Sequence, residues 1–340
     1  MAWTDQLNGD SITWLLEADN PNVRYLALRD LLDRLEGDKD LEEARRVAYQ
    51  TEPLARVLKY KKEPGYWVKP GAGYSPKYKS TVWSIILLAQ LGARICDEPA
   101  VVEASQYLLD HALTPDGQFG TNGKPSNTID CLQGNLCWAL SAMGCDDPRL
   151  EKAYDWMARS VTGDGVAPQK DTQTTVRYYA YKCGPTFACG ANNKQPCAWG
   201  GVKVMLAFAS LAENKKTPLI KKAIQQGAEF LLGIDPVDAA YPIRVGDKPN
   251  RAWWKFGFPV YYVTDLLQNV EALVRLGYQN DPRLAHALQY IRDKQDQQGR
   301  WLMEYDYAEK TWGKYGEKKQ PNKWVTLRAL RVLKMAGSQN

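Results

Sequence analysis

The residues best suited to chemistry in this sequence are four cysteines and the acid that precedes one of them. One cysteine lies near the start of an apolar segment, another opens the next apolar segment, and two lie in the loop between them: Cys131, Cys197, Cys183 and Cys189. Thiolates and carboxylates are common ligands of zinc, with a zinc–sulfur distance of about 2.3 Å. We therefore predict a Zn2+ site that draws its ligands from Asp130, Cys131, Cys183, Cys189 and Cys197.

The chemical role of this site has more than one interpretation. Four thiolates would close the coordination sphere and make the site structural, whereas two or three, with or without Asp130, leave a position for a substrate. The cysteines are also small enough to be ordinary buried apolar residues, which is how we interpret Cys137 and Cys145. Disulfides are a less favoured use of seven cysteines in a chain whose first residues do not resemble an export signal.

The composition is that of an ordinary globular protein. The chain has 340 residues, of which 44% are hydrophobic and 24% charged, and its formal net charge is +5. These values exclude intrinsic disorder, collagen and small disulfide scaffolds. The apolar stretches are shorter than the roughly 20 residues that a membrane helix needs, so we expect a cytoplasmic protein with no membrane span.

Apolar residues recur at helical spacing, which predicts an all-α protein. A unit recurs: a helix with one apolar stripe, a turn, a loop, and a helix that is apolar on most sides. These apolar helices are expected to begin near Pro21, Ser80, Asn127, Cys197, Gly257 and Asn322. We predict a single (α/α)6 toroid domain over residues 1–340, with six inner and about six outer helices. An open superhelix is the alternative, because the segment after Asn20 resembles a HEAT-type repeat helix.

One turn carries a motif with known relatives. The segment from Tyr290 to Trp301 has an aromatic–aliphatic pair, Gln295 and a final Gly-Arg-Trp, and degenerate copies end near Phe119, Val166 and Trp67. It resembles the QW motif of the terpenoid cyclase and protein prenyltransferase superfamily, whose members share the α/α toroid. The motif is structural, because its Gln can bond backbone groups at a helix end while its Trp packs over that end.

The motifs of this superfamily limit the reactions that we expect. The Asp-x-Asp-Asp element of squalene-type cyclases and the Asp-Asp-x-x-Asp magnesium motif are absent from the sequence, so a protonation-initiated cyclase is not expected. Asp130-Cys131 resembles the Asp-x-Cys zinc pair of prenyltransferase β subunits with one residue deleted, and Cys197 stands where the next zinc ligand would be. No His lies nearby, which departs from that pattern.

The loops that lead into the inner helices are basic. Residues 66–79, 120–129, 164–196, 242–256 and 307–323 carry 17 basic and five acidic residues, interleaved with aromatic ones such as Trp254. A positive opening favours an anionic ligand. The alternative is that these loop charges are solvated and bind no ligand. The predicted anion-binding residues are Lys79, Arg251, Lys255 and Lys323, and the predicted apolar contacts are Trp83, Trp199, Trp254, Phe258, Tyr261 and Trp324.

These observations lead to one functional hypothesis and one alternative. The hypothesis is a terpenoid cyclase- or prenyltransferase-like enzyme that acts on an anionic, partly apolar, isoprenoid diphosphate-like molecule, with zinc at the opening. Nucleic acid is not an expected partner, since a concave toroid favours a small ligand. Asp130, Asp265, Glu304 and Asp306 are the predicted acid, base or catalytic groups. The alternative is a non-catalytic toroid that binds a peptide or lipid, with the cysteines in a structural zinc site or simply buried.

Overall fold

A computed structural model describes residues 2–165, 182–243 and 248–337. This part of the chain contains thirteen α-helices: α1 (Ser11–Leu15), α2 (Pro21–Asp30), α3 (Lys39–Gln50), α4 (Leu54–Lys59), α5 (Thr81–Gln90), α6 (Pro99–Ala112), α7 (Asp130–Ala142), α8 (Arg149–Thr162), α9 (Ala198–Ala209), α10 (Pro218–Leu232), α11 (Leu266–Arg275), α12 (Ala285–Asp293) and α13 (Lys323–Gly337). A two-stranded antiparallel hairpin joins β1 (Ala188–Cys189) to β2 (Gln195–Pro196). The all-α fold class predicted from the sequence is confirmed.

Seven short 3-10 helices connect these elements in the described residues. They are η1 (Trp3–Gln6), η2 (Pro125–Asn127), η3 (Pro185–Phe187), η4 (Gly190–Asn192), η5 (Glu213–Lys215), η6 (Arg251–Trp254) and η7 (Pro282–Leu284). Among the described helices, none is long and apolar enough to cross a membrane.

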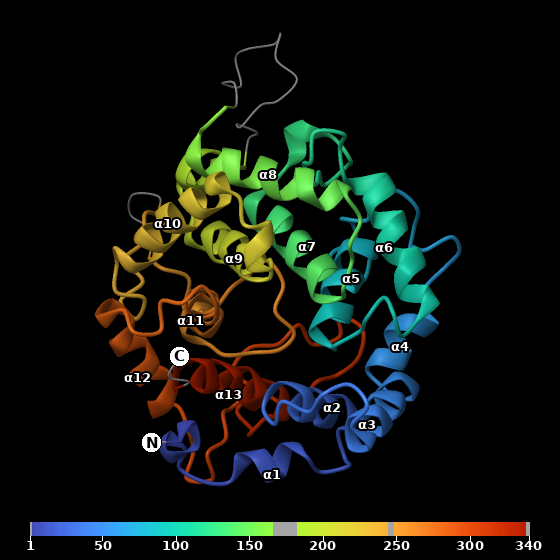
Figure 1. Ribbon diagram of the computed structural model, residues 1–340, viewed down its shortest axis with the longest axis vertical. Helices are drawn as coiled ribbons and strands as arrows, with labels where there is room; N and C mark the ends of the chain where they lie inside the picture. Colours follow the sequence, from blue (N-terminus) through green and yellow to red (C-terminus); the bar gives the residue numbers. More distant parts are fainter. Residues whose placement is uncertain (1, 166–181, 244–247, 338–340) are drawn as a thin grey trace.

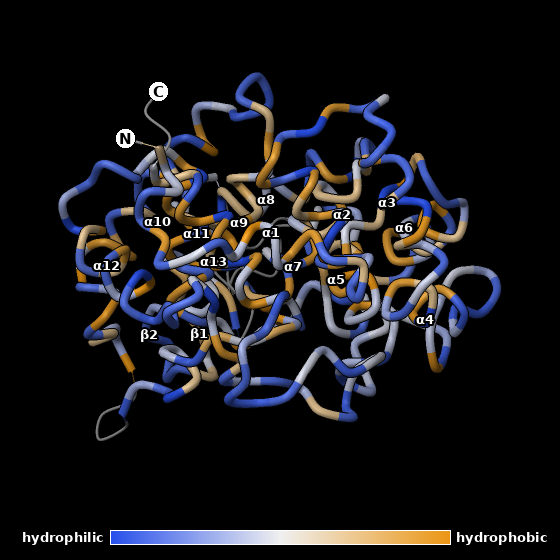
Figure 2. The backbone as a smooth tube through the Cα atoms, turned by 90° about the horizontal axis from the view of Figure 1, so that it is seen from below, coloured by the Kyte–Doolittle hydropathy of each residue, from blue (hydrophilic) through white to orange (hydrophobic). Residues whose placement is uncertain are grey.

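The α-helices lie in two layers. Figure 1 shows α2, α5, α7, α9, α11 and α13 around the middle of the molecule, with the other helices outside them. We call the first set the central helices and the second set the outer helices. Consecutive central helices contact one another in the order α2, α13, α11, α9, α7, α5. The apolar tube segments lie mainly within the helical layers, whereas the connecting loops are mostly hydrophilic (Figure 2).

Local sequence explains why the central helices begin where they do. The Asn20 side chain accepts a hydrogen bond from the backbone N–H of Val23 at 3.2 Å, and Pro21 follows as the first helical residue. Every residue of α5 from Thr81 to Leu88 is buried, as expected for a helix that is packed on nearly all sides. Four other predicted starts lie within three residues of the observed ones.

The start predicted near Gly257 is wrong, because α11 begins at Leu266. The intervening chain contains Pro259 and a run of β-branched and aromatic residues, which favour extended backbone. The Gln90 amide holds it by accepting from the N–H of Val260 at 2.7 Å and donating to its carbonyl at 2.8 Å. The segment is therefore non-helical, with residues 257–261 buried, before Asp265 caps α11.

Helices α7 and α9 make the closest helix contact among the central helices, and glycine permits it. A Cβ added to Gly134 of α7 would lie 2.3 Å from the backbone carbonyl carbon of Lys203, and one added to Gly200 of α9 would lie 3.0 Å from Asp130 Cβ. Such distances leave no room for any side chain at Gly134. This contact places Asp130 and Lys203 on facing helices in the interior.

The turn residues make the contacts expected of them. The Trp301 indole N–H donates to the Ile291 carbonyl near the end of α12 at 2.9 Å, and Gln295 donates to the Arg292 carbonyl at 3.2 Å. Trp67 makes the equivalent bond to the Val57 carbonyl in α4 at 2.8 Å. Each tryptophan therefore fixes an outer helix to the turn that follows it.

We expect Gly134→Ala to destabilise the protein, although alanine is the better helix former. Helix propensity alone would stabilise by about 1 kcal/mol, whereas overpacking against the Lys203 backbone costs about 3 kcal/mol. Urea unfolding should show a net loss of about 2 kcal/mol in the free energy of unfolding. Gly227→Ala is the matched control, because its Cβ would meet the flexible Met205 side chain instead of backbone. An unchanged or higher stability of Gly134→Ala would contradict the close packing of α7 and α9.

Candidate functional site

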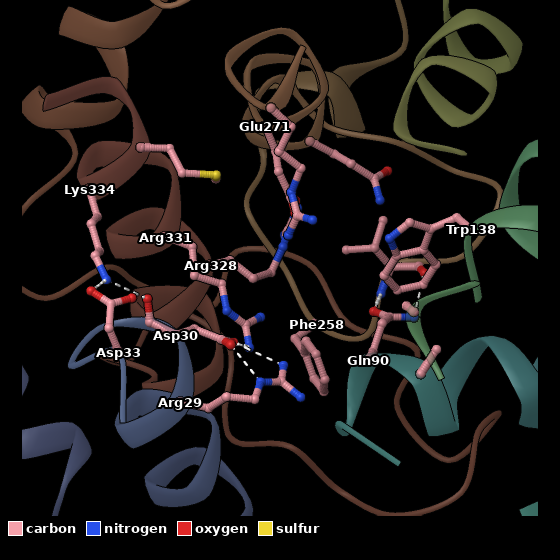
Figure 3. A pocket seen from close by; sticks show the side chains of 16 residues that line it. Arg29, Asp30, Asp33, Gln90, Trp138, Phe258, Glu271, Arg328, Arg331 and Lys334 are labelled. Carbon is pink, nitrogen blue, oxygen red and sulfur yellow. Dashed lines mark hydrogen bonds and ion pairs between the residues drawn. The ribbon is translucent and has the colours of Figure 1, made fainter. Parts of the chain in front are cut away.

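A cavity of about 520 Å³ lies among the central helices. It is located at the end of the molecule where α2, α5, α7 and α13 terminate, and it includes one side of α11. We call it the central cavity. Figure 3 shows charged side chains from α2 and α13 facing Trp138 and Gln90 across it. The residues that line it are Arg29, Asp30, Asp33, Ala89, Gln90, Trp138, Ala142, Phe258, Val260, Gln268, Glu271, Arg275, Arg328, Arg331, Lys334 and Met335.

One acid in the charged wall is shared by two arginines. Asp30, in the last turn of α2, accepts from Arg29 at 2.6 Å and forms an ion pair with Arg331 of α13. Burial acts to raise the pKa of Asp30, but the two guanidinium groups outweigh it and hold that pKa well below its usual range. Burial also lowers the pKa of Arg331. Two cations therefore share one carboxylate, which leaves an excess positive charge.

The remaining cations of this wall are each held by an acid. Lys334 contacts Asp33 at 2.5 Å, and Arg275 contacts Glu271 at 2.8 Å one helical turn away. Counting only the lining side chains, five are cationic and three are acidic. The central cavity is therefore strongly polar on one side and positive overall.

Arg328, which lines the cavity, forms a buried ion pair with Asp265. Both Asp265 oxygens accept from the Arg328 guanidinium at 2.8 Å, and Arg328 also donates to the Gly257 carbonyl at 2.7 Å. Asp265 caps α11 as well, by accepting from the backbone N–H of Gln268 at 2.8 Å. Asp265, predicted as an acid or base, is thus engaged in an ion pair and a helix cap that join α11 to α13.

Apart from Gln90 and Gln268, the uncharged side chains that line the central cavity are apolar. They include Trp138, Val260 and Phe258, which form the apolar wall, and the Phe258 ring stacks on Trp324 with centroids 4.3 Å apart. Phe258 also lines a second cavity of about 450 Å³ near the loop that precedes α13. The Phe258 ring therefore stands between the two cavities. Of the residues predicted from the sequence to contact a ligand, Phe258 lies in the central cavity and Lys79 in the second one.

A buried lysine, Lys203, contacts the side chain of Gln268, which lines the central cavity. Lys203 of α9 is 1% exposed and donates to the side-chain oxygen of Gln268, which also accepts from the Thr264 hydroxyl at 2.7 Å. Burial lowers the pKa of Lys203 to about 7, although Asp265 acts in the opposite direction. Two donors on the Gln268 oxygen fix the orientation of its amide, and Gln268 lines the cavity.

The predicted metal ligands lie at the other end of the central helices. Cys131 is in the first turn of α7 and Cys197 immediately precedes α9. Cys189 and Cys197 line a third cavity, of about 340 Å³. The neighbouring Cys197 thiol and the backbone N–H groups of Ala191 and Asn192 lower the pKa of Cys189 to about 6, while the Cys189 thiol and burial raise the pKa of Cys197 well above its usual value.

Asp130 stands close to these thiols but does not complete a metal site. Its Oδ2 atom is buried without a hydrogen-bond partner, and burial, with a smaller contribution from Cys189, raises the pKa of Asp130 well above its usual value. In residues 2–165, 182–243 and 248–337, no group of three or more His, Cys, Asp or Glu residues is placed to hold a metal ion. The arrangement thus does not fit zinc as it stands, and the zinc site stays a prediction.

The other predicted acids and cations are bound to protein groups. Glu304 accepts from Lys294 at 2.6 Å and from the backbone N–H of Phe256 at 2.9 Å. Asp306 faces the second cavity and pairs with Lys318 at 3.3 Å. Lys323 is buried and pairs with Glu17 at 2.8 Å and also with Asp19. Such pairing competes with the binding of an external anion.

The predicted apolar residues divide into separate groups. Trp83 and Tyr261 pack in an aromatic cluster with ring centroids 5.5 Å apart, and Tyr261 is fully buried. Trp199 lines the third cavity beside Cys197. Trp254 donates to the Val237 carbonyl at 2.6 Å, while Arg251 and Lys255 in the same segment are exposed to solvent. These residues do not converge on one site.

Sequence reasoning missed the charged wall of the central cavity. Arg328, Arg331 and Lys334 recur every third residue along α13, and Arg29-Asp30 end α2. A charged residue on a helix is normally solvated, so its type alone does not mark it as a site residue. The available signal is the position of these charges within helices predicted to be central, where every charge needs a buried partner. Lys203, in an otherwise apolar helix, carries the same signal.

Comparison with known proteins gives little further guidance. No protein-family model matches the chain, and no curated protein matches it. Among solved structures, it is similar to the type II terpene cyclase MstE from Scytonema, both in its apo form and as a variant in complex with the substrate geranylgeranyl dihydroxybenzoate. Each has 14% identity and a TM-score of 0.32 over 84% of this chain and 95% of that one. A likeness this weak assigns neither a fold family nor an activity.

The depressed pKa of Lys203 predicts a pH dependence of stability. An unfolded lysine keeps a pKa near 10.5, whereas the folded one titrates at about 7. Between these values the folded protein binds fewer protons, so the free energy of unfolding gains up to about 1.4 kcal/mol per pH unit as the pH rises. The free energy of unfolding of wild type minus that of Lys203→Met, measured by urea unfolding, should rise by about 2 kcal/mol between pH 7.5 and 9.0. Equal pH slopes would show that Lys203 titrates normally.

Proposed function

We propose that the protein binds an amphipathic anion, of the isoprenoid diphosphate type, in the central cavity. The observation that carries the proposal is the sharing of Asp30 by Arg29 and Arg331 opposite the apolar wall. A ligand with a negative head and an apolar body matches both walls at once. The cavity volume of about 520 Å³ lies in the ordinary range for small-molecule sites.

The two arginines would hold the anionic group. Each guanidinium has five N–H donors, and Asp30 occupies only part of that capacity. Hydrogen bonds between arginine and a phosphate group are charge-assisted and often bidentate. A diphosphate placed here would neutralise the excess charge that the single carboxylate leaves. Trp138, Phe258 and Val260 would then contact the apolar part of the ligand.

The charges of this wall also suggest which reaction the cavity supports. All three acids that line it are ion-paired, and the two guanidinium groups beside Asp30 hold the pKa of that carboxyl well below its usual range, which makes it a poor proton donor. Arginines can instead stabilise negative charge that grows on a leaving group. We therefore propose ionisation of an allylic diphosphate, in which the carbon–oxygen bond breaks and the diphosphate keeps the electron pair. This agrees with the absence of an Asp-x-Asp-Asp element from the sequence.

A closed (α/α)6 toroid is part of this proposal. Two observations support it: the six central helices contact one another in sequence, and Gly92, two residues beyond the end of α5, lies against α2, where an added Cβ would be 2.6 Å from Leu26 Cδ2. Seven outer helices surround them in the described residues (Figure 1). A thiolate-bound zinc remains a separate prediction, and no step of the proposed reaction passes through a metal.

We expect Arg331→Gln to weaken binding of pyrophosphate and of farnesyl diphosphate at least tenfold at low ionic strength. Asp30 keeps Arg29 as its partner in this variant, so the fold is retained. Lys255→Gln is the matched control. Lys255 is an exposed cation in the loop directly after η6, and this substitution should change the affinity less than twofold. Isothermal titration calorimetry gives both values.

A larger loss of affinity in Lys255→Gln than in Arg331→Gln would place the anion site at the basic loops. Binding of neither compound to the wild-type protein would contradict the proposal altogether. Release of pyrophosphate from farnesyl diphosphate then separates an enzyme from a binding protein. Binding without release supports the non-catalytic toroid that the sequence left open.

A further inference from the structure

The second cavity, near the loop that precedes α13, has the size of a small-molecule site of its own. Its volume is about 450 Å³. Most of its wall comes from one stretch of chain, residues 306–316, which we call the 306–316 segment. Arg56 of α4, Lys79 just before α5 and Phe258 complete the wall. Four parts of the chain that are distant in sequence therefore enclose this space.

The charges of the second cavity leave one cation in excess. Its wall carries three basic side chains and two acidic ones, which are Arg56, Lys79, Lys314, Asp306 and Glu309. A ligand with a single negative charge balances this excess, whereas a diphosphate carries more negative charge than the wall can balance. The second cavity thus favours a different anion from the one that the central cavity favours.

Lys79 is the cation that is most available to a ligand. Its side chain is half-buried, and its ammonium nitrogen lies 5.6 Å from the centre of the Trp312 ring. In the described part of the chain, no acid lies within ion-pair distance of Lys79. The ammonium group therefore keeps its N–H donors for an external acceptor, and hydrogen bonds from a charged donor to a carboxylate are strong.

The Arg56 guanidinium is only partly engaged. Its Nη1 atom lies 3.3 Å from a carboxylate oxygen of Glu52, an exposed residue four positions earlier. Exposed ion pairs of this kind contribute little. The Arg56 Nε atom is buried, and no hydrogen-bond acceptor for it lies in the described residues. Arg56 therefore adds positive charge to the cavity that no buried acid neutralises.

Uncharged donors of the 306–316 segment also lack acceptors. Tyr307 is 4% exposed, and its hydroxyl is buried without a hydrogen-bond partner among the described residues. The backbone N–H groups of residues 311–316 donate to no acceptor in residues 2–165, 182–243 and 248–337. Successive N–H groups in a turn can form a concave site for an anion. The segment thus offers donors to a ligand oxygen.

Aromatic rings form the apolar part of the wall. Phe258 and Tyr315 meet at an interplanar angle of 69°, with ring centroids 5.0 Å apart. The Tyr315 hydroxyl donates to the Trp312 carbonyl at 2.6 Å, which fixes the position of its ring. A ligand ring packs favourably against such rings in an edge-to-face or offset arrangement. A ligand that has both a ring and an anionic group therefore matches this wall.

We propose that the second cavity binds a small carboxylate that carries an aromatic ring. The carboxylate contacts Lys79 and the N–H donors of the 306–316 segment, and the ring packs against Phe258 and Tyr315. This site is separate from the central cavity, although Phe258 lines both. It does not depend on the ligand of the central cavity, because different cations hold each ligand.

The experiment uses the full-length protein with phenylacetate as the probe. Isothermal titration calorimetry at low ionic strength measures binding. We expect the wild type to bind phenylacetate at least tenfold more tightly than the uncharged phenylacetamide. Saturating pyrophosphate, at matched ionic strength, should change the affinity for phenylacetate less than twofold, because the two sites use separate cations.

Two substitutions test the contacts of the ligand. Lys79→Gln should weaken phenylacetate binding at least tenfold. Lys77→Gln is the matched control and should change it less than twofold, because Lys77 is exposed and lies over the Tyr262 ring, outside the cavity. Tyr307→Phe should weaken binding at least threefold without lowering the Tm, since the hydroxyl that it removes has no partner in the described protein.

The wild-type measurements test the proposal even if a variant fails to fold. Absence of binding at millimolar phenylacetate, or equal affinity for phenylacetate and phenylacetamide, would overturn it. Displacement of phenylacetate by pyrophosphate would also overturn it, because the two compounds would then share one site. Equal losses in Lys79→Gln and Lys77→Gln would contradict a specific contact with Lys79. Pyrophosphate binding itself tests the central cavity, so either proposal can fail alone.

Discussion

Burying a charge without a partner costs several kcal/mol, and this cost determines how the cavity end of the central helices is built. Helix α13 carries Arg328 and Arg331 into the interior and Lys334 to its edge, and each meets an acid from another segment. Those acids are Asp265, which caps α11, Asp30 at the end of α2, and Asp33 three residues later. The charges of α13 therefore fix the positions of α2 and α11 around it, and the central cavity is what remains between them.

The acids that line the cavity are fewer than the cations, so the cavity keeps a net positive charge. Asp265 satisfies Arg328 completely, with both oxygens engaged, whereas Asp30 divides its oxygens between Arg29 and Arg331. The first pair joins helices, and the second leaves donors that an incoming anion can use. Buried ion pairs thus serve both stability and ligand binding. One cation meets one acid at Arg328–Asp265, whereas two cations share one acid at Asp30.

The sequence is enough to predict the helical class and most central helices, because those helices show their burial as continuous apolar runs. It fails at Gly257, where an equally apolar run is non-helical chain held by Gln90, a contact 170 residues away in sequence. The site is harder to predict than the fold. Loop charges are visible in a sequence, whereas spacing alone does not separate a solvated helix face from a buried one. Only the packing of α2 against α13 turns Arg29, Asp30 and Arg331 into a single group.

The central claim is that the anion site lies between Arg29 and Arg331 and not at the basic loops. A crystal structure of the wild-type protein with bound farnesyl diphosphate tests it most directly. Phosphate oxygens within hydrogen-bond distance of both guanidinium groups, with the isoprenoid chain against Trp138, are the predicted result. A diphosphate held by Arg251 and Lys255, with the central cavity free of ligand, would contradict the account.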